Sequence, residues 1–335
     1  MWNRLVSSTL RLAKISKNAH IGHRQLHLTG PQAFASFESE SEIREQYERD
    51  GFVIVRNAID RDLAREIQGH VDWMLQRFPE LPPEQLHHPL IEYDAFWLRI
   101  VSDPALLRLA AEFVGESIAL FASHYFCKMP RSGQEVLWHQ DGAYWPLKPM
   151  KVVSLWLAVD HSSRENGCLR VVRGSHRQAL KELSRAGGDN VLSSYTDVDI
   201  REEDVVDIEL QPGDVEIHHP NIIHGSEANT SDKRRCGLTI RYIPTSTSVV
   251  ASPDDPIVPM NWLLRGNAIP GVNIYRSWPA YNATYSFPFQ GSHEWNDRSE
   301  VAAKAVEESK SLTEEVVKQT SLSKAQIVVN GLKNT

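Results

Sequence analysis

Two histidines and one carboxylate form the pattern in this chain that is best suited to chemistry. One residue separates His139 from Asp141, and His224 follows far downstream. On an extended strand, residues two apart leave the same face, so the first two side chains can reach one metal ion together. Two histidines and one carboxylate form the facial triad that holds Fe(II) and leaves coordination positions open. The pattern predicts an iron site for oxygen chemistry, with His224 supplied by a distant strand.

Two arginines beyond the second histidine have the parity to face the same site. Arg235 and Arg241 lie on one side of a predicted strand, whereas Arg234 has the opposite parity. A planar guanidinium can bind a carboxylate through two hydrogen bonds, which suits a dicarboxylate co-substrate. The pattern alone allows either Arg235 or Arg241 to be this clamp. His218 and His219 are not expected to be ligands.

Short apolar or alternating runs from residue 118 onward predict the strands that would position these side chains. Turn signals at Asn166-Gly167 and Pro212-Gly213 separate some of them. Such spacing is typical of a sandwich or jelly roll. The expected strands are 118–128, 135–140, 152–160, 168–172, 205–210, 214–218, 222–225 and 235–244. The polar segment 180–204 is expected to be a long excursion over the mouth of the site.

The chain before residue 118 is richer in helix signals. Helices are expected at about 38–47, 62–78 and 104–113, with Asp60 as the N-cap of the second and a strand at 51–56. The expected fold class is mainly β with helical support (α+β), with N-terminal helices packed on a jelly-roll core. We expect one domain over residues 34–295 and a helical or flexible tail over 296–335.

The composition excludes several classes of protein. The chain has 335 residues, of which 41% are hydrophobic and 24% charged, as in an ordinary globular enzyme. Its net charge of -7 lacks the basic footprint of a nucleic-acid binder, and no apolar run is long enough to span a membrane. Cys127, Cys168 and Cys236 are too few and too scattered for a disulfide framework or a thiolate metal site, which suits a reducing compartment.

The first 33 residues have the composition of a targeting sequence. They contain five Lys or Arg residues and no Asp or Glu, and Trp2, Val6 and Leu10 recur at helical spacing. We expect a mitochondrial presequence over residues 1–33, recognised by the mitochondrial import machinery, with a mature start near Phe34 and a location in the matrix. A disordered basic N-terminus is the simpler alternative, and a peroxisomal or cytoplasmic location is the alternative to the matrix.

Several motifs, specific in combination, resemble those of the phytanoyl-CoA dioxygenase family. They are Phe126-Cys-Lys-Met-Pro130, Trp138-His-Gln-Asp-Gly142, Leu155-Trp-Leu-Ala-Val-Asp160, Glu165-Asn-Gly-Cys-Leu169, Gly174-Ser-His176, and His219-Pro220 followed by His224-Gly-Ser226. The resemblance spans roughly residues 51–245. Arg173 departs from the pattern, because family members often have Pro before the Gly-Ser-His element. Asp141 is kept, whereas related halogenating enzymes have a small residue there, so hydroxylation is favoured.

The resemblance implies a double-stranded β-helix (jelly-roll, cupin-like) that uses Fe(II), 2-oxoglutarate and O2, with ascorbate as the reductant. By position, His139, Asp141 and His224 match the iron ligands of the family. Arg235 matches the arginine that binds the distal carboxylate of 2-oxoglutarate, and Ser226 and Trp156 match residues that help to hold 2-oxoglutarate. Gln140 matches a residue that neighbours the ligands. The implied reaction hydroxylates an unactivated C–H bond of a small-molecule or acyl substrate and decarboxylates 2-oxoglutarate to succinate.

The substrate is left open by the sequence. A basic cluster, Arg164, Arg170, Arg173, Arg177, Lys181 and Arg185, is dense enough for an acyl-CoA, although a solvated basic face is the favoured interpretation. Tyr144 and Trp145 either line a substrate pocket or pack in the core, and Lys128 either points into the pocket or is solvated. Two other functions remain: a cupin-type metal enzyme that does not use 2-oxoglutarate, and a non-catalytic binding or scaffold protein with a retained metal site.

Overall fold

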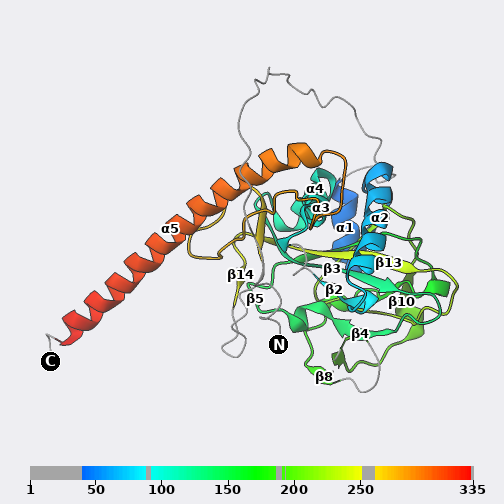
Figure 1. Ribbon diagram of the computed structural model, residues 1–335. Helices are drawn as coiled ribbons and strands as arrows, with labels where there is room; N and C mark the ends of the chain where they lie inside the picture. The colour runs from blue at the N-terminus through cyan, green and yellow to red at the C-terminus, as the bar shows by residue number, and fades with distance from the viewer. Residues whose placement is uncertain (1–39, 88–91, 186–190, 193, 251–260, 333–335) are drawn as a thin grey trace, which may run out of the picture. The chain divides into compact units, whose positions relative to one another are not determined.

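The computed structural model describes residues 40–87, 92–185, 191–192, 194–250 and 261–332 (Figure 1). The predicted presequence and the start near Phe34 lie outside the described residues. The helices of this part are α1 (Glu40–Asp50), α2 (Arg61–Arg77), α3 (Ala95–Val101), α4 (Pro104–Val114) and α5 (Ser292–Leu332). None of them is long and apolar enough to cross a membrane.

Antiparallel sheets form the rest of the described structure. The larger sheet has the order β1 (Phe52–Val55), β11 (Val215–His218), β6 (Val153–Ala158), β13 (Arg235–Pro244), β3 (Ile118–Lys128) and β15 (Trp262–Arg265), with β2 (Leu86–His87) also paired to β3. The smaller sheet has the order β10 (Val205–Ile208), β7 (Leu169–Val172), β12 (Ile223–Ser226) and β4 (Val136–Gln140). Two-stranded pairs join β14 (Ser248–Val249) to β5 (Leu147–Lys148) and β8 (Leu183–Arg185) to β9 (Ser194–Thr196).

The predicted elements are largely confirmed. Every strand expected between residues 118 and 244 is present, with its ends within two residues of the prediction. The three predicted helices correspond to α1, α2 and α4, and the mainly antiparallel α+β fold is the expected one. The segment 180–204, expected to be a long excursion, contains the strand pair β8–β9, which was not predicted. The tail forms one helix, α5, which begins at Ser292.

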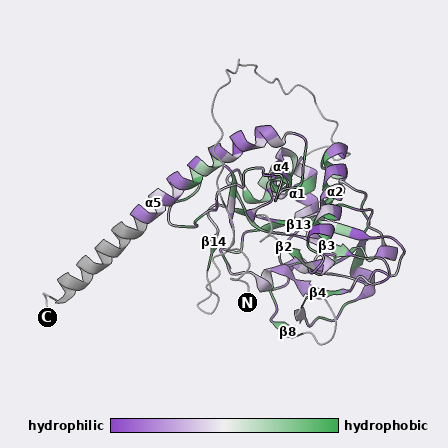
Figure 2. Cartoon of the chain, viewed as in Figure 1, coloured by the Kyte–Doolittle hydropathy of each residue, from purple (hydrophilic) through white to green (hydrophobic). Residues whose placement is uncertain are grey.

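The helices pack on the larger sheet through one continuous apolar core. The N-cap of α2 is Asp60, whose side chain accepts a hydrogen bond from the backbone N–H of Asp62. On this helix Ile67, Val71 and Met74 recur at helical spacing and are almost fully buried in the core. Burying each such side chain contributes roughly 1.5–3 kcal/mol. Hydrophilic residues prevail on the rest of α2 and at the start of α5 (Figure 2).

A second apolar cluster lies between the two sheets. It joins Trp156 and Ala158 of β6 to Leu169 and Val171 of β7 and to Ile222 beside β12. This cluster fixes the distance between the sheets, and therefore between β13 on one side and β4 and β12 on the other. The residues expected to form the site are on these three strands or directly beside them.

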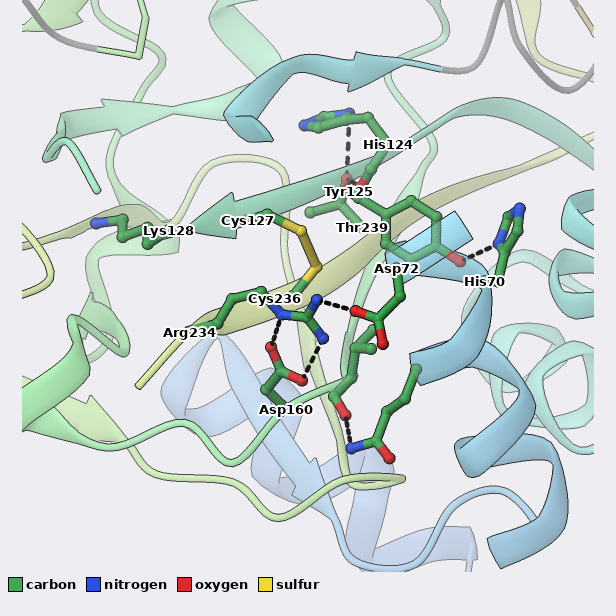
Figure 3. The surroundings of a disulfide bond; sticks show 12 residues. His70, Asp72, His124, Tyr125, Cys127, Lys128, Asp160, Arg234, Cys236 and Thr239 are labelled. Atoms are coloured by element: carbon green, nitrogen blue, oxygen red, sulfur yellow. Dashed lines mark hydrogen bonds and ion pairs between the residues drawn. A yellow bond between two sulfur atoms is a disulfide. The ribbon is translucent and has the colours of Figure 1, made fainter. Parts of the chain in front are cut away.

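The prediction for the cysteines was wrong in part. Cys127 and Cys236, which are far apart in sequence, form a disulfide between β3 and β13 (Figure 3), whereas Cys168 is free and buried. The register of these two strands places Cys236 directly opposite Cys127, with their Cα atoms 4.1 Å apart. Spacing along the chain could not show this, because the pairing depends on which strands are neighbours.

Candidate metal centre

Adjacent strands of the smaller sheet bring the two histidines together. In the register of β12 and β4, His224 lies directly opposite His139, and the centroids of the two imidazole rings are 4.1 Å apart. We expected the third residue, Asp141, to lie on the same strand as His139, but it does not. β4 ends at Gln140, and Asp141 is the first residue of a 3-10 turn (Asp141–Tyr144). A hydrogen bond from the backbone N–H of Gly142 to the carbonyl of Pro220 ties this turn to the segment before β12.

The three side chains present their donor atoms to one point. One donor atom from each of His139, Asp141 and His224 lies within 4.8 Å of the others, and all three residues are buried. The Nδ1 atoms of His139 and His224 lie 2.7 Å from the carbonyl of Leu137 and 3.1 Å from that of Ile222. Because a carbonyl can only accept, both Nδ1 atoms carry hydrogen and both Nε2 lone pairs remain available. This donor set fits a divalent metal ion such as Fe(II).

The two carboxylate oxygens of Asp141 have different surroundings. Oδ1 lies 3.6 Å from His139 Nε2 and 4.0 Å from His224 Nε2, so it faces the common point. Oδ2 lies 3.2 Å from Arg241 Nη2 and accepts a 3.4 Å hydrogen bond from Ser154. Burial favours the neutral acid, but the positive charge of Arg241 and the histidine hydrogen bonds outweigh it and hold the pKa of Asp141 well below its usual value. The carboxylate is therefore ionised and ready to bind a cation.

Burial also keeps the second histidine neutral. Desolvation, followed by the nearby His139, lowers the pKa of His224 well below its usual value of 6.5. A neutral imidazole is the form that binds a metal. The protonation states of His224 and Asp141 thus both suit the metal site before any metal binds.

Sequence reasoning missed the contribution of a third histidine. His218, at the end of β11, lines the same cavity, and its Nε2 lies 3.6 Å from Asp141 Oδ2. Its Nδ1 lies 2.7 Å from Oε2 of Glu216, which is fully buried. Burial lowers the pKa of His218, but the two carboxylates outweigh it and raise the pKa to about 9. The signal in the sequence was the equal parity of Glu216 and His218, which places both on one face of β11.

Arg235 reaches the cavity from the opposite sheet without a carboxylate partner. It is 2% exposed, and within the described residues no Asp or Glu lies at ion-pair distance from it. Its guanidinium donates to the carbonyl of Gly167 through Nε (2.9 Å) and Nη2 and lies 5.4 Å from the centroid of the Trp156 ring. Burial lowers the pKa of Arg235 to about 10. The preceding Arg234 pairs with Asp160 and Asp72 outside the cavity (Figure 3).

Ser226 and Trp156 line the same cavity, next to Arg235. The Ser226 hydroxyl accepts a 2.7 Å hydrogen bond from Nζ of Lys128, which also donates to the carbonyl of Glu227. Lys128 is fully buried, and burial, followed by the charge of Arg235, lowers its pKa to about 6. The lysine is therefore neither solvated nor in the cavity, and it holds Ser226 from behind.

The other predicted cofactor residue lies elsewhere. Gln140 is fully buried and bonds to backbone groups: it donates to the carbonyl of Asn221 at 2.8 Å and accepts from the N–H of Lys181 at 3.0 Å. It is not among the residues that line the cavity. Its position on the strand explains this, because Gln140 points to the opposite face from His139. Its contacts fix the loop that precedes β12.

The cavity that contains the triad has a volume of about 340 Å³ and is lined mainly by apolar and aromatic side chains. This is within the range of small-molecule sites. Tyr144, Trp145 and Arg241 line it, on the Asp141 side, and the Tyr144 hydroxyl donates to the carbonyl of Ser194 at 2.7 Å. Tyr144 and Trp145 thus line the cavity, which was one of the two alternatives that the sequence left open. The site is a largely apolar cavity that contains the candidate metal-binding triad and two arginines.

The sequence profile described as "Phytanoyl-CoA dioxygenase (PhyH)" matches residues 47–237, which is more than half of the chain. This chain belongs to the phytanoyl-CoA dioxygenase family. It is 27% identical over 172 residues to the phytanoyl-CoA dioxygenase of Arabidopsis thaliana, and the match covers 51% of this chain and 61% of that protein. Other relatives include the phytanoyl-CoA dioxygenases of Homo sapiens and Bos taurus that are named as peroxisomal.

Solved structures support the same fold. The apo form of the non-heme monooxygenase ThoJ superimposes with a TM-score of 0.62 at 23% identity, covering 83% of this chain and 99% of that one. The epimerase SnoN, solved with Fe3+ and α-ketoglutarate, gives a TM-score of 0.54 at 19% identity, covering 70% and 97%. Both structures are less than 25% identical to this chain, so they support the fold. The cupin-like fold expected for the family is the fold observed here.

Proposed function

We propose that this protein is an Fe(II)- and 2-oxoglutarate-dependent dioxygenase that hydroxylates an unactivated C–H bond of a small molecule. The observation that carries the proposal is Arg235, a buried cation without a carboxylate partner among the described residues, in the cavity that holds the triad. A buried charge without a partner is costly unless a ligand supplies the opposite charge. A dicarboxylate co-substrate would supply the negative charge that Arg235 lacks. A cupin-type enzyme that does not use 2-oxoglutarate would leave this buried arginine unexplained.

The residues that form the site have separate roles in this proposal. His139, Asp141 and His224 would hold Fe(II), which supplies the oxygen chemistry when bound together with 2-oxoglutarate and O2. Arg235 would bind the distal carboxylate, and Ser226, held by Lys128, would be a second donor there. Arg241 is less suited to this task, because it lies beside the metal ligand Asp141, whereas the distal carboxylate is several bonds away from the chelating end. The apolar wall would exclude water from the reaction.

The surface charges favour a small substrate over an acyl-CoA. Three members of the basic cluster are already neutralised: Arg170 pairs with Asp207 and Glu227, Arg164 with Asp207, and Arg173 lies 3.7 Å from Asp50. These ion pairs leave three of the six members, Arg177, Lys181 and Arg185, for a nucleotide phosphate. We further propose that residues 1–33 direct import into the mitochondrial matrix, that the oxygenase domain spans 34–295 and that 296–335 form its tail. A peroxisomal location is the alternative, as the names of some relatives suggest.

The first test measures decarboxylation of 2-oxoglutarate by the full chain with Fe(II) and ascorbate. We expect succinate to form even without the prime substrate, through slow uncoupled turnover, and Asp141→Ala to abolish it because the metal loses its only carboxylate ligand. Iron content and 2-oxoglutarate binding are measured in parallel. Iron binding without 2-oxoglutarate binding would refute the proposal in favour of a cupin-type enzyme. Binding of both without succinate, across a substrate screen, would favour the scaffold protein.

A further inference from the structure

The cavity contains a second buried guanidinium that the proposed function does not use. Arg241 is 7% exposed and lines the cavity six residues after Arg235 on β13. That separation corresponds to about 20 Å of strand. Arg235 contacts Trp156 and Gly167, whereas Arg241 contacts Trp145 and Asp141, so they serve different ends of the cavity.

Arg241 is held firmly in its place. Its Nη1 donates to the hydroxyl of Thr239 at 2.9 Å and lies 3.0 Å from Nδ1 of His124. Its guanidinium carbon is 5.3 Å from the centroid of the Trp145 ring. Nη2 is 3.2 Å from Oδ2 of Asp141, which is the ion-pair partner of Arg241 within the described residues, and Nε is buried without a hydrogen-bond partner among them. A guanidinium fixed on two sides is preorganised to bind a planar anion, because little side-chain freedom is lost on binding.

The charges that line the cavity compensate Arg241 only in part. Among the lining residues Arg235 and Arg241 are fixed cations and Asp141 is a carboxylate, while His218 is paired with the buried Glu216. Fe(II) and the two carboxylates of 2-oxoglutarate would cancel each other, so one positive charge remains. Asp141 cannot neutralise Arg241 fully when its other oxygen binds a metal ion. A low-dielectric chamber favours a ligand that brings the missing negative charge.

The surroundings of Arg241 define the rest of that ligand. Trp145 stacks edge-on with Phe121 at 5.7 Å between ring centroids, and Tyr144 lies against His139 at 5.9 Å. These aromatic side chains line the cavity beside Arg241 and the metal ligands. An anion bound here would therefore place an apolar body, rather than another polar group, next to the reacting metal.

We propose that Arg241 binds the carboxylate of the primary substrate, and that this substrate is a small, apolar carboxylic acid rather than its CoA thioester. The inference rests on the proposed function and specifies its substrate. A thioester has no free carboxylate at that end. Arg235 would thus select the co-substrate and Arg241 the substrate, each through a carboxylate.

The test compares acids with their amides as probes. The protein is loaded with Fe(II) and 2-oxoglutarate without oxygen, and calorimetry measures the dissociation constants of three matched pairs: 3-phenylpropanoate, hexanoate and benzoate, each against its amide. We expect at least one acid to bind ten-fold or more tightly than its amide, and hexanoyl-CoA to bind less tightly than hexanoate. Arg241→Gln should remove the preference for the acid, and Arg241→Lys should keep part of it, because the charge remains but the fork is lost.

The controls separate this site from the others. Arg164→Gln removes a charge of the surface cluster and should leave the preference for the acid unchanged. The affinity for 2-oxoglutarate should change less than three-fold in Arg241→Gln; an equal loss of both affinities would assign Arg241 to the co-substrate site and overturn the proposal. Equal binding of acid and amide in every pair, or tighter binding of the thioester, would also overturn it. The ratio of the dissociation constants of each acid and its amide is also measured without 2-oxoglutarate. Failure of 2-oxoglutarate to bind would then refute the proposed function, whereas the acid–amide ratio would still test the role of Arg241.

Discussion

Replacing Arg235 by Met tests whether this arginine binds a ligand or only stabilises the fold. The pKa of Arg235 falls from 12.5 to about 10 because it is buried without a counter-charge. At about 1.4 kcal/mol for each pKa unit, burial of this charge costs roughly 3 kcal/mol. Arg235→Met removes that cost but leaves the carbonyl of Gly167 without its donor and the Trp156 ring without the cation, which together cost roughly 2–4 kcal/mol. The two effects nearly cancel.

We therefore expect the free energy of unfolding of the metal-free protein to change by less than about 2 kcal/mol, as measured by urea denaturation. The affinity for 2-oxoglutarate, measured by calorimetry with Fe(II) in the absence of oxygen, should fall by about 2–5 kcal/mol. That is a loss of roughly 30-fold to several-thousand-fold. Arg235→Lys should recover only part of it, because an ammonium cannot form the two parallel hydrogen bonds of the guanidinium.

Arg234→Met is the matched control. This neighbouring arginine is in ion pairs with Asp160 and Asp72 outside the cavity, so its loss should lower stability and leave the 2-oxoglutarate affinity unchanged. The reasoning is refuted if Arg235→Met behaves like this control. A large loss of stability with unchanged affinity would mean that Arg235 is a structural residue.

Two further predictions concern residues around the site. The pKa of His219 is lowered from 6.5 to about 4 by burial and the nearby histidines, and its Nδ1 accepts from the backbone N–H of Asn221. The folded protein therefore resists protonation of His219. The contribution of neutral His219 to the stability is complete above pH 6.5 and is lost as the pH falls toward 4. We expect about 1–2 kcal/mol of this loss after solvent screening, and a smaller loss in His219→Gln, by urea denaturation at pH 7 and 4.5; parallel curves would contradict this. In Gly237→Ala, the new Cβ would overlap the Trp156 ring. Displacing that ring should cost about 1–3 kcal/mol of stability and weaken 2-oxoglutarate binding, and calorimetry showing wild-type affinity would argue against a role of Trp156 in that site.

Local patterns were sufficient to predict most of the elements and to select three side chains whose donor atoms lie close together. Strand periodicity placed β3 and β13 with the correct ends, and the turn residues Asn166-Gly167 and Pro212-Gly213 marked two of the connections between the larger and the smaller sheet. The spacing of His139 and Asp141 and the parity of Arg235 were enough to propose side chains that share one cavity in the structure. These inferences succeed because the direction of a side chain follows from the backbone within a few residues.

The sequence could not reveal features that depend on which strands are neighbours. The pairing of Cys127 with Cys236 requires the register of β3 and β13, and the contact of His218 with Asp141 joins the larger sheet to a turn after the smaller one. The hairpin β8–β9 within the expected long excursion was not predicted, since its strands are short and polar.

The sequence by itself determined the kinds of side chain available for chemistry: two histidines, a carboxylate and arginines of known parity. Only the tertiary structure decided their charges and partners. It shows that Arg241 is paired with Asp141 while Arg235 is buried without a carboxylate among the described residues. The two arginines have the same parity on the same strand, so no local pattern distinguishes them. The difference arises from burial and from the neighbours that other strands bring, and both are properties of the folded chain.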